Sequence, residues 1–288
     1  STLSSSSAAS DVYKRQIHVN ENSYTALVLA ADRAGGDPVA RMAGTACKAF
    51  APVGGQPMVL RVLDALMGCE QVSTILLCGP PEALLAQCPE LEQRIESGKV
   101  GWIRNQNSPS QSAAAGLVQV AEDQRVFLTT ADHALLSTEI VAYFLQKSIE
   151  CDGDATVGMI RHETIQHRFP QNRRTIIRLA DANLCGCNLF TFNPRGRGLV
   201  TFWQQAEALR KRPWRLVSQV LGWQAVWAYL RGNLSLDQAM HTVSQKSGVK
   251  VAPVMMPFAE AGIDVDKPTD WQLVESVLAD RISVTSQS

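Results

Sequence analysis

Short apolar runs alternate with segments of helical periodicity through the first half of the chain. Buried strands are predicted at residues 25–31, 73–78, 100–103 and 125–130. Between them, apolar positions recur at helical spacing in residues 57–68, and Ser108, Pro109 and Gln111 start a further helix that runs to about Glu122. Alternating strands and helices build a parallel sheet with crossover helices.

The second half of the chain is less regular and more helical. Strands are predicted at residues 155–160, 176–179, 184–192 and 250–256, and helices at 199–230, 235–247 and 268–282. The segment 199–230 is interrupted near Pro213 and Gly222. The whole pattern predicts an α/β fold of three layers, with a mostly parallel central sheet, crossover helices and a helical insertion in the C-terminal half.

No repeat or low-complexity segment interrupts the patterned region. Residues 23–282 are therefore interpreted as a single domain with two halves, about 23–150 and about 151–282. The serine-rich segment 1–22 is predicted to be a disordered tail outside the native domain, and residues 283–288 a short tail.

Composition narrows the class of protein. The chain has 288 residues, 45% of them hydrophobic, which is enough for a large core. A formal net charge of zero argues against a nucleic-acid partner. Seven scattered cysteines favour a reducing compartment over a disulfide framework. With no apolar run long enough to span a bilayer and no signal peptide, a cytoplasmic protein is expected.

The loop after the first strand has the features of a phosphate site. The strand ends at Ala31, and glycines, arginines and a single lysine follow it: Arg33, Gly35, Gly36, Arg41 and Lys48. Ligands bind at the carboxyl ends of parallel strands, glycines let backbone N–H groups approach a phosphate, and Arg and Lys supply positive charge. The alternative for Lys48 is a solvated loop lysine.

Three carboxylates could carry chemistry, and one of them, Asp132, stands where a metal ligand is expected. Asp132 follows the buried strand directly, while Asp264 and Asp266 alternate with Ile263 and Val265 and so share one face of the chain. Mg²⁺ takes one or two carboxylates together with phosphate oxygens and water. The alternative is that these aspartates cap the helices that follow them.

These motifs resemble those of a known family. Leu29-Ala30-Ala31, Arg41-Met42, Lys48 and Gly55-Gln56-Pro57-Met58 resemble the signature loop of the GT-A-like, Rossmann-related nucleotidyltransferases, which include the MobA-like and the sugar-phosphate and methylerythritol-phosphate cytidylyltransferase types. Residues 131–135, 262–271 and 186–190 resemble later motifs of that family, although His133, Ala134 and Leu135 follow Asp132 without the usual proline. Residues 32–38 are longer than the family loop, which leaves open whether Arg33 or Arg41 acts.

The resemblance implies a Mg²⁺-dependent nucleotidyltransferase. It would join an NMP from an NTP, with a mild preference for CTP, to a phosphorylated or phosphonylated small molecule and release pyrophosphate. By the same resemblance Asp132 and Asp264 hold the metal, Asp266 is mainly structural, and Lys48 acts with Arg33 or Arg41 on the triphosphate. Nucleotide contacts are expected from Ala30, Ala31, Gly35, Gly36, Ser110 and Ser112, and acceptor contacts from Arg173, Arg178 and Asn188.

Two rival functions stay open at this point: a glycosyltransferase that uses a nucleotide sugar, and a nucleotide-binding sensor without turnover. The oligomeric state is left open as well. Tryptophans in the long helical segment are expected to pack in the core, with an amphipathic helix at a membrane surface as the alternative: Trp203, Trp214, Trp223 and Trp227.

Overall fold

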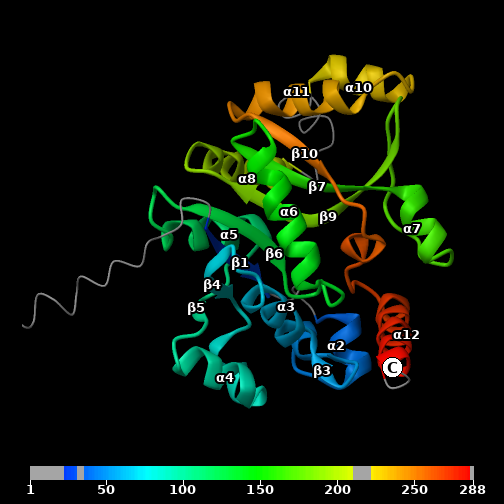
Figure 1. Ribbon diagram of the computed structural model, residues 1–288. Coiled ribbons are helices and arrows are strands. Elements are labelled where there is room, and N and C mark those ends of the chain that lie inside the picture. Colours follow the sequence, from blue (N-terminus) through cyan, green and yellow to red (C-terminus); the bar gives the residue numbers. More distant parts are fainter. Residues whose placement is uncertain (1–22, 31–35, 210–221, 286–288) are drawn as a thin grey trace, which may run out of the picture.

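A mixed sheet of eight strands forms the centre of the molecule in the computed structural model, which describes residues 23–30, 36–209 and 222–285 (Figure 1). The main path through the sheet runs in the order β10-β7-β9-β6-β1-β4-β5, with β8 paired to β9. β9 is antiparallel to β6, β7 and β8, and the remaining pairs are parallel. The predicted α/β fold with a mostly parallel central sheet is confirmed.

The strands of the central sheet are β1 (Tyr24–Leu29), β4 (Val72–Cys78), β5 (Gly101–Ile103), β6 (Arg125–Thr130), β7 (Ala155–Arg161), β8 (Ile177–Arg178), β9 (Asn183–Phe192) and β10 (Val251–Met255). A small hairpin pairs β2 (Pro52–Val53) with β3 (Gln56–Pro57). The helices of the first half are α2 (Pro38–Ala43), α3 (Met58–Met67), α4 (Pro89–Glu96), α5 (Pro109–Val118) and α6 (Thr138–Glu150), with 3₁₀ turns η1 (Lys48–Phe50) and η2 (Glu82–Gln87). Those of the second half are α7 (His162–Arg168), α8 (Gly198–Leu209), α10 (Trp223–Leu230), α11 (Leu236–Ser247) and α12 (Pro268–Thr285), with 3₁₀ turns η3 (Arg195–Arg197) and η5 (Ala259–Gly262).

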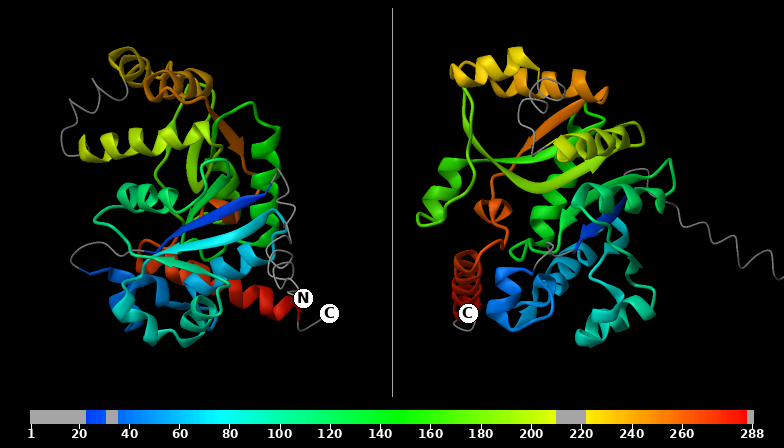
Figure 2. Two further views of the ribbon diagram at one scale, coloured as in Figure 1. Left: turned by 90° about the vertical axis from the view of Figure 1, so that its left-hand side faces the viewer. Right: turned by 180° about the vertical axis from the view of Figure 1, so that it is seen from behind.

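Helices cover both faces of the sheet, which makes three layers. On one face α3 and α6 pack with Ala26 and Val28 of β1, and on the other α5 and α8 pack with Leu27 and Leu29. Figure 2 shows α5 and α8 on the same side of the sheet. Successive side chains of a strand point to opposite faces. β1 is therefore buried along its whole length, which explains its continuous apolar sequence.

Close packing of α5 on β1 gives a first testable prediction. A Cβ added to Gly116 of α5 would lie 2.5 Å from Leu27 Cδ1 and 3.1 Å from Leu27 Cγ. Because Leu27 is fully buried, Gly116→Ala is expected to lower the free energy of unfolding by about 1–2 kcal/mol despite the better helix propensity of alanine. Urea unfolding measures the effect. Gly186→Ala is the control: no heavy atom lies within 4 Å of a Cβ there, and a change within about 0.5 kcal/mol is expected. Equal stability of the two variants would contradict the packing.

Two helices lie where only loops were expected. In α2, Asp37 accepts a hydrogen bond from Val39 N at 2.8 Å, and Pro38 takes the first helical position. This start signal lies at the end of residues 32–38, which the family resemblance treats as a longer loop. In α7, Ile165 and the following Phe169 are buried, but the helix is too short to show a periodic pattern.

The tryptophans do not pack as expected. Trp203 is half-buried and packs against the part of the core that contains residues of α5. Trp223 and Trp227 of α10, in contrast, are 48% and 55% exposed. The prediction of core packing is therefore wrong for these two, and Trp214 lies outside the described residues. Within the described parts of the chain, no helix is long and apolar enough to cross a membrane.

Candidate active site

A cavity of about 490 Å³ opens where β1 and β6 end side by side. Its polar lining gathers residues from six separate parts of the chain: Asp37, Lys48, Ser112, Thr130, Asp132, Asn188, Asp264 and Asp266. The cavity lies beside the carboxyl ends of the parallel strands β1 and β6, the place where α/β sheets bind ligands. The fold thus brings together the lysine and the carboxylates that the sequence singled out.

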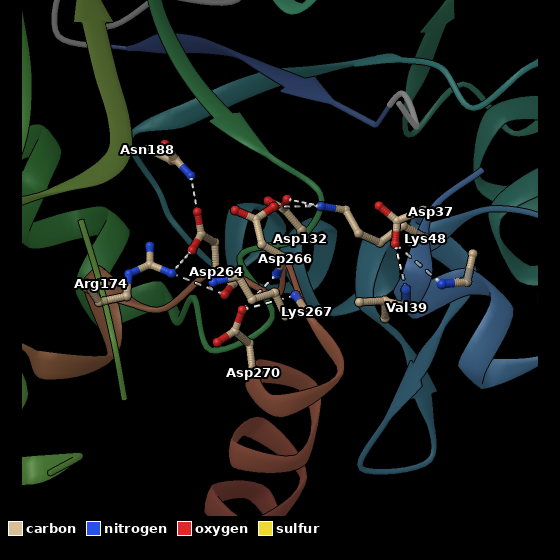
Figure 3. A network of polar contacts seen from close by, with 11 residues as sticks. Asp37, Val39, Lys48, Asp132, Arg174, Asn188, Asp264, Asp266, Lys267 and Asp270 are labelled. Atoms are coloured by element: carbon tan, nitrogen blue, oxygen red, sulfur yellow. Dashed lines mark hydrogen bonds and ion pairs between the residues drawn. The ribbon is translucent and has the colours of Figure 1, made fainter. Parts of the chain in front are cut away.

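Lys48 lies between two carboxylates. Its Nζ is 2.5 Å from Asp132 Oδ2 and 3.3 Å from Asp266 Oδ1 (Figure 3). Burial alone would lower the pKa of Lys48 and is the largest single effect. The charge and the hydrogen bond of Asp132, together with the charges of Asp266 and Asp37, outweigh it and raise the pKa above its ordinary value. For Asp132, burial would raise the pKa, yet Lys48 holds it below the usual range. The pair is therefore ionised at neutral pH, so a fixed positive charge faces the cavity.

Asp264 has its own cation and amide. Arg174 forms an ion pair with Asp264 Oδ1, and Asn188 Nδ2 donates to Asp264 Oδ2 at 2.7 Å. Asn188 has φ of 50°, in the left-handed region that Asn adopts more readily than most residues. Figure 3 shows Arg174 and Asn188 on one side of the carboxylates and Lys48 on the other. The site is thus a row of aspartates with a cation at each end.

The aspartates do not act as the caps that the alternative hypothesis required. Ser137 caps α6 by accepting from Ile140 N, so Asp132 does not cap that helix. At the start of α12, Asp270 accepts from the backbone N–H groups of Asp266 and Lys267. The carboxylates of Asp132 and Asp266 point instead to Lys48.

The donor set suits a hard divalent cation. Asp132 Oδ1 is buried and has no hydrogen-bond partner among the described residues. Val265 N donates to Asp132 O at 3.0 Å, which fastens the segment carrying Asp264 to the end of β6. No group of three or more His, Cys, Asp or Glu side chains placed for a metal occurs in the described residues. Two carboxylates completed by phosphate oxygens and water are, however, what Mg²⁺ uses.

Apart from Ser110, the other predicted site residues divide into three sets. Ala30, Ser112 and Asn188 line the cavity, and Ser112 Oγ also accepts from Gln106 N at 2.8 Å. Exposed and outside the cavity lining are Gly36, Arg41, Arg173 and Arg178. Outside the described residues are Ala31, Arg33 and Gly35.

Ser110 is engaged elsewhere in the protein. It is 1% exposed, and its hydroxyl and backbone N–H both donate to Glu207 Oε2 of α8. Ser108 Oγ donates to the same oxygen at 2.8 Å. The carboxylate of Glu207 therefore occupies the N-terminus of α5, and the N-terminal end of a helix favours negative charge.

Several site residues were not foreseen. Asp37 lines the cavity, Asp266 pairs with Lys48 although only a structural role was expected, and Arg174 rather than Arg173 or Arg178 meets a carboxylate. The Asp37-Pro38 start signal could have located the first. For Arg174, neighbouring arginines carry the same local signal, so only the fold shows which one faces inward.

The fold is that of a nucleotidyltransferase-like domain. Residues 26–243 match the family model of the MobA-like NTP transferase domain, and the chain belongs to this family. The resemblance inferred from the sequence motifs is thereby confirmed. A comparison with curated proteins found no match.

Solved structures show the same fold. A hypothetical transferase from Thermus thermophilus has 26% identity and a TM-score of 0.72, over 86% of this chain and 99% of that one. CMP:2-keto-3-deoxy-manno-octonic acid synthetase, complexed with CTP, has 15% identity and a TM-score of 0.54, over 90% and 100% of the two chains. 4-Diphosphocytidyl-2C-methyl-D-erythritol synthase from Anaerococcus prevotii has 11% identity and a TM-score of 0.53, over 91% and 99%. At these last two identities the likeness is one of fold alone.

Proposed function

We propose that the protein is a Mg²⁺-dependent nucleotidyltransferase that joins an NMP from an NTP, preferably CTP, to a phosphorylated or phosphonylated small molecule and releases pyrophosphate. One observation carries the proposal: in a chain of the MobA-like NTP transferase family, Lys48 lies between Asp132 and Asp266 at the mouth of a cavity of about 490 Å³. Two neighbours of the same fold are cytidylyl-type enzymes, one of them solved in complex with CTP, and they support the choice of CTP.

Transfer requires little covalent chemistry from the protein. An anionic oxygen of the acceptor attacks the α-phosphorus, and the bond to the oxygen that bridges the α- and β-phosphorus breaks, so the electron pair leaves with pyrophosphate. Negative charge develops on the α-phosphoryl oxygens and on the leaving group. Lys48, held ionised beside Asp132, is placed to stabilise that charge. Because an acceptor phosphate is already anionic near neutral pH, no general base is needed and positioning contributes most of the rest.

The charge balance of the site favours a divalent cation. Four aspartates, Asp37, Asp132, Asp264 and Asp266, line the cavity, and the cations paired with them are Lys48 and Arg174. Among the described residues the aspartates of the cavity outnumber these two cations, and such an excess of negative charge repels a triphosphate. Bound Mg²⁺, held by Asp132 and Asp264, would neutralise that excess and the phosphate charge. In this scheme Arg174 and Asn188 hold the carboxylate of Asp264 in place for the metal.

Nucleotide contacts fall to the residues beside the ends of β1 and α5. Ala30 and Ser112 line the cavity there, and both are proposed to contact the nucleotide. Ala31, Gly35 and Gly36 are proposed to contribute backbone contacts, and Arg33 or Arg41 a charge on the triphosphate. The Ser110 hydroxyl donates to Glu207, so Ser110 is proposed to support this surface by holding α8 against α5. The proposed acceptor residues are Asn188, Arg173 and Arg178.

Substitutions of Asn188 separate its side-chain role from its backbone role. Asn188→Gly and Asn188→Ala both remove the amide that donates to Asp264 Oδ2, so both are expected to lower nucleotidyl transfer by about 10-fold or more. Only alanine is penalised at φ 50°, so Asn188→Ala is expected to be about 1 kcal/mol less stable than Asn188→Gly. Steady-state rates and urea unfolding measure the two effects. Full activity of the glycine variant would show that the amide does not position Asp264.

The proposed function is tested by a pyrophosphate-release screen. The purified protein is incubated with each common ribonucleoside triphosphate and a panel of phosphorylated and phosphonylated acceptors, with and without Mg²⁺. Pyrophosphate that appears only with an acceptor and Mg²⁺, and fastest with CTP, is the expected result. Nucleotide binding with no pyrophosphate from any acceptor would favour a sensor, and sugar transfer from a nucleotide sugar with NDP release would favour a glycosyltransferase.

A further inference from the structure

The cavity continues beyond the carboxylates into a part that has an apolar lining. We call this part the apolar lobe and define it by the residues Leu128, Phe190, Phe192, Leu199, Val200 and Trp203. They come from β6, β9 and α8. Among these side chains only the Trp203 indole carries a polar atom. The lobe therefore differs sharply from the aspartate-rich end of the same cavity.

The strand register shows how deep the lobe runs. On β6, Leu128 and Thr130 precede Asp132 at intervals of two and so follow one face of the sheet. Leu128 is paired with Phe190 and Val126 with Phe192 on β9. A strand advances about 3.3 Å per residue, so the level of Phe192, which is paired with Val126, lies about 13 Å inward from Thr130, the last residue of β6. The cavity thus extends from the charged sheet edge along the face of the sheet.

Helix α8 covers the lobe and is fastened near both ends. Near its start, Arg197 donates to Val120 O at 3.0 Å and to Gln124 O at 2.8 Å, in the connection between α5 and β6. Near its end, Glu207 accepts from Ser108 and Ser110 at the N-terminus of α5. Charge-assisted hydrogen bonds of this kind fix the helix in place. The apolar lobe therefore lies beneath a helix whose position is fixed by hydrogen bonds near both of its ends.

The chemistry of the two ends selects the ligand. Hydroxyl groups of a sugar would lose their hydration in the lobe without finding partners, which costs binding energy. Aliphatic carbon gains about fourfold in affinity for each methylene buried. A nucleobase has polar edges and is better placed beside Ala30 and the Ser112 hydroxyl, which line the other end of the cavity. The apolar lobe therefore suits an apolar part of the acceptor, the second substrate of the proposed reaction.

We propose that the acceptor is amphiphilic, with its anionic phosphate or phosphonate at the end that holds Lys48 and Asp132 and an aliphatic or aromatic body in the apolar lobe. The inference rests on the proposed nucleotidyl transfer for the position of the phosphate, but the lobe's preference for an apolar body is independent of catalysis. Compact sugar phosphates then leave the lobe empty and bind weakly.

Calorimetry with n-alkyl phosphates tests the inference without turnover. Butyl, hexyl and octyl phosphate are titrated into the protein with Mg²⁺ and no NTP. Affinity is expected to rise with chain length, approaching fourfold per methylene and reaching at least about tenfold from butyl to octyl. Glycerol phosphate, whose hydroxyls oppose burial, is expected to bind more weakly than butyl phosphate.

Two matched variants locate the effect. Leu199→Trp adds bulk from a half-buried wall of the lobe and is expected to flatten the chain-length series. Val118→Trp adds the same indole on α5 at a position that is 80% exposed, and is expected to keep the wild-type series. Circular dichroism checks that both variants are folded. If one is not folded, the chain-length series of the wild-type protein alone decides the test.

The outcomes separate the two proposals. A flat wild-type series, or no binding of octyl phosphate, overturns the amphiphilic acceptor even if pyrophosphate is released with a compact sugar phosphate. A steep series that Leu199→Trp leaves unchanged overturns the placement of the body in the lobe. A steep series lost only in Leu199→Trp supports the inference even where the pyrophosphate screen fails.

Discussion

Lys48→Ala is expected to lower the rate of nucleotidyl transfer by about 10²–10³-fold. The substitution removes the ammonium group that lies 2.5 Å from Asp132 Oδ2 and 3.3 Å from Asp266 Oδ1, and with it the fixed positive charge at the cavity mouth. Because Asp132 then loses its cation in a buried place, a loss of about 1–3 kcal/mol in stability is expected as well. The rate of pyrophosphate release at saturating NTP, corrected for the folded fraction from urea unfolding, measures the catalytic part.

Lys147→Ala is the matched control. Lys147 also pairs with a carboxylate, Glu150 Oε2 at 2.6 Å, but this pair is exposed on α6. Exposed pairs contribute little to stability, so this variant should keep the wild-type rate and stability. A Lys48→Ala enzyme that also kept the wild-type rate would remove Lys48 from the catalytic machinery.

Asp132→Asn is expected to raise the Mg²⁺ concentration for half-maximal rate by at least about 10-fold. The change keeps the shape of the side chain but removes the negative charge whose Oδ1 is buried without a hydrogen-bond partner in the described residues. Titration of the rate with Mg²⁺ at fixed NTP measures the shift. Calorimetric titration of the free protein with Mg²⁺ gives a readout that does not depend on turnover.

Asp152→Asn controls for loss of a paired aspartate. Asp152 Oδ2 lies 2.5 Å from Lys250 Nζ, but its side chain is 96% exposed, and an unchanged Mg²⁺ titration is expected. If Asp132→Asn behaved in the same way, the metal would have to be held without Asp132. Since Ser137 already caps α6, Asp132 would then act only as the partner of Lys48.

Features with a local signal could be predicted from the sequence. The continuous apolar run of β1 follows from burial on both faces, and Ser108 and Ser235 mark their helices because a capping residue acts within three positions. Asp132 stood out for a similar reason, as a charge at the end of a buried strand. These arguments located β1, β6 and the main carboxylate of the site.

Partnerships across the chain could not be predicted in the same way. Lys48 meets Asp266, and Arg174 meets Asp264, only because the sheet brings the start of α12 to the ends of β1 and β6. Spacing in the sequence contains no information about such contacts. The apolar lobe is a further example, because its walls come from β6, β9 and α8 and each of them is an ordinary core segment on its own.

The fate of the α-phosphate tests the central claim most directly. The protein is supplied with CTP labelled at the α-phosphate, Mg²⁺ and the best acceptor from the screen, and the labelled products are separated and counted against pyrophosphate. The account predicts that the label enters the acceptor in a one-to-one ratio with pyrophosphate, and that Lys48→Ala slows both together. Label that stays in CTP, CDP or free CMP while the acceptor remains unlabelled would contradict it.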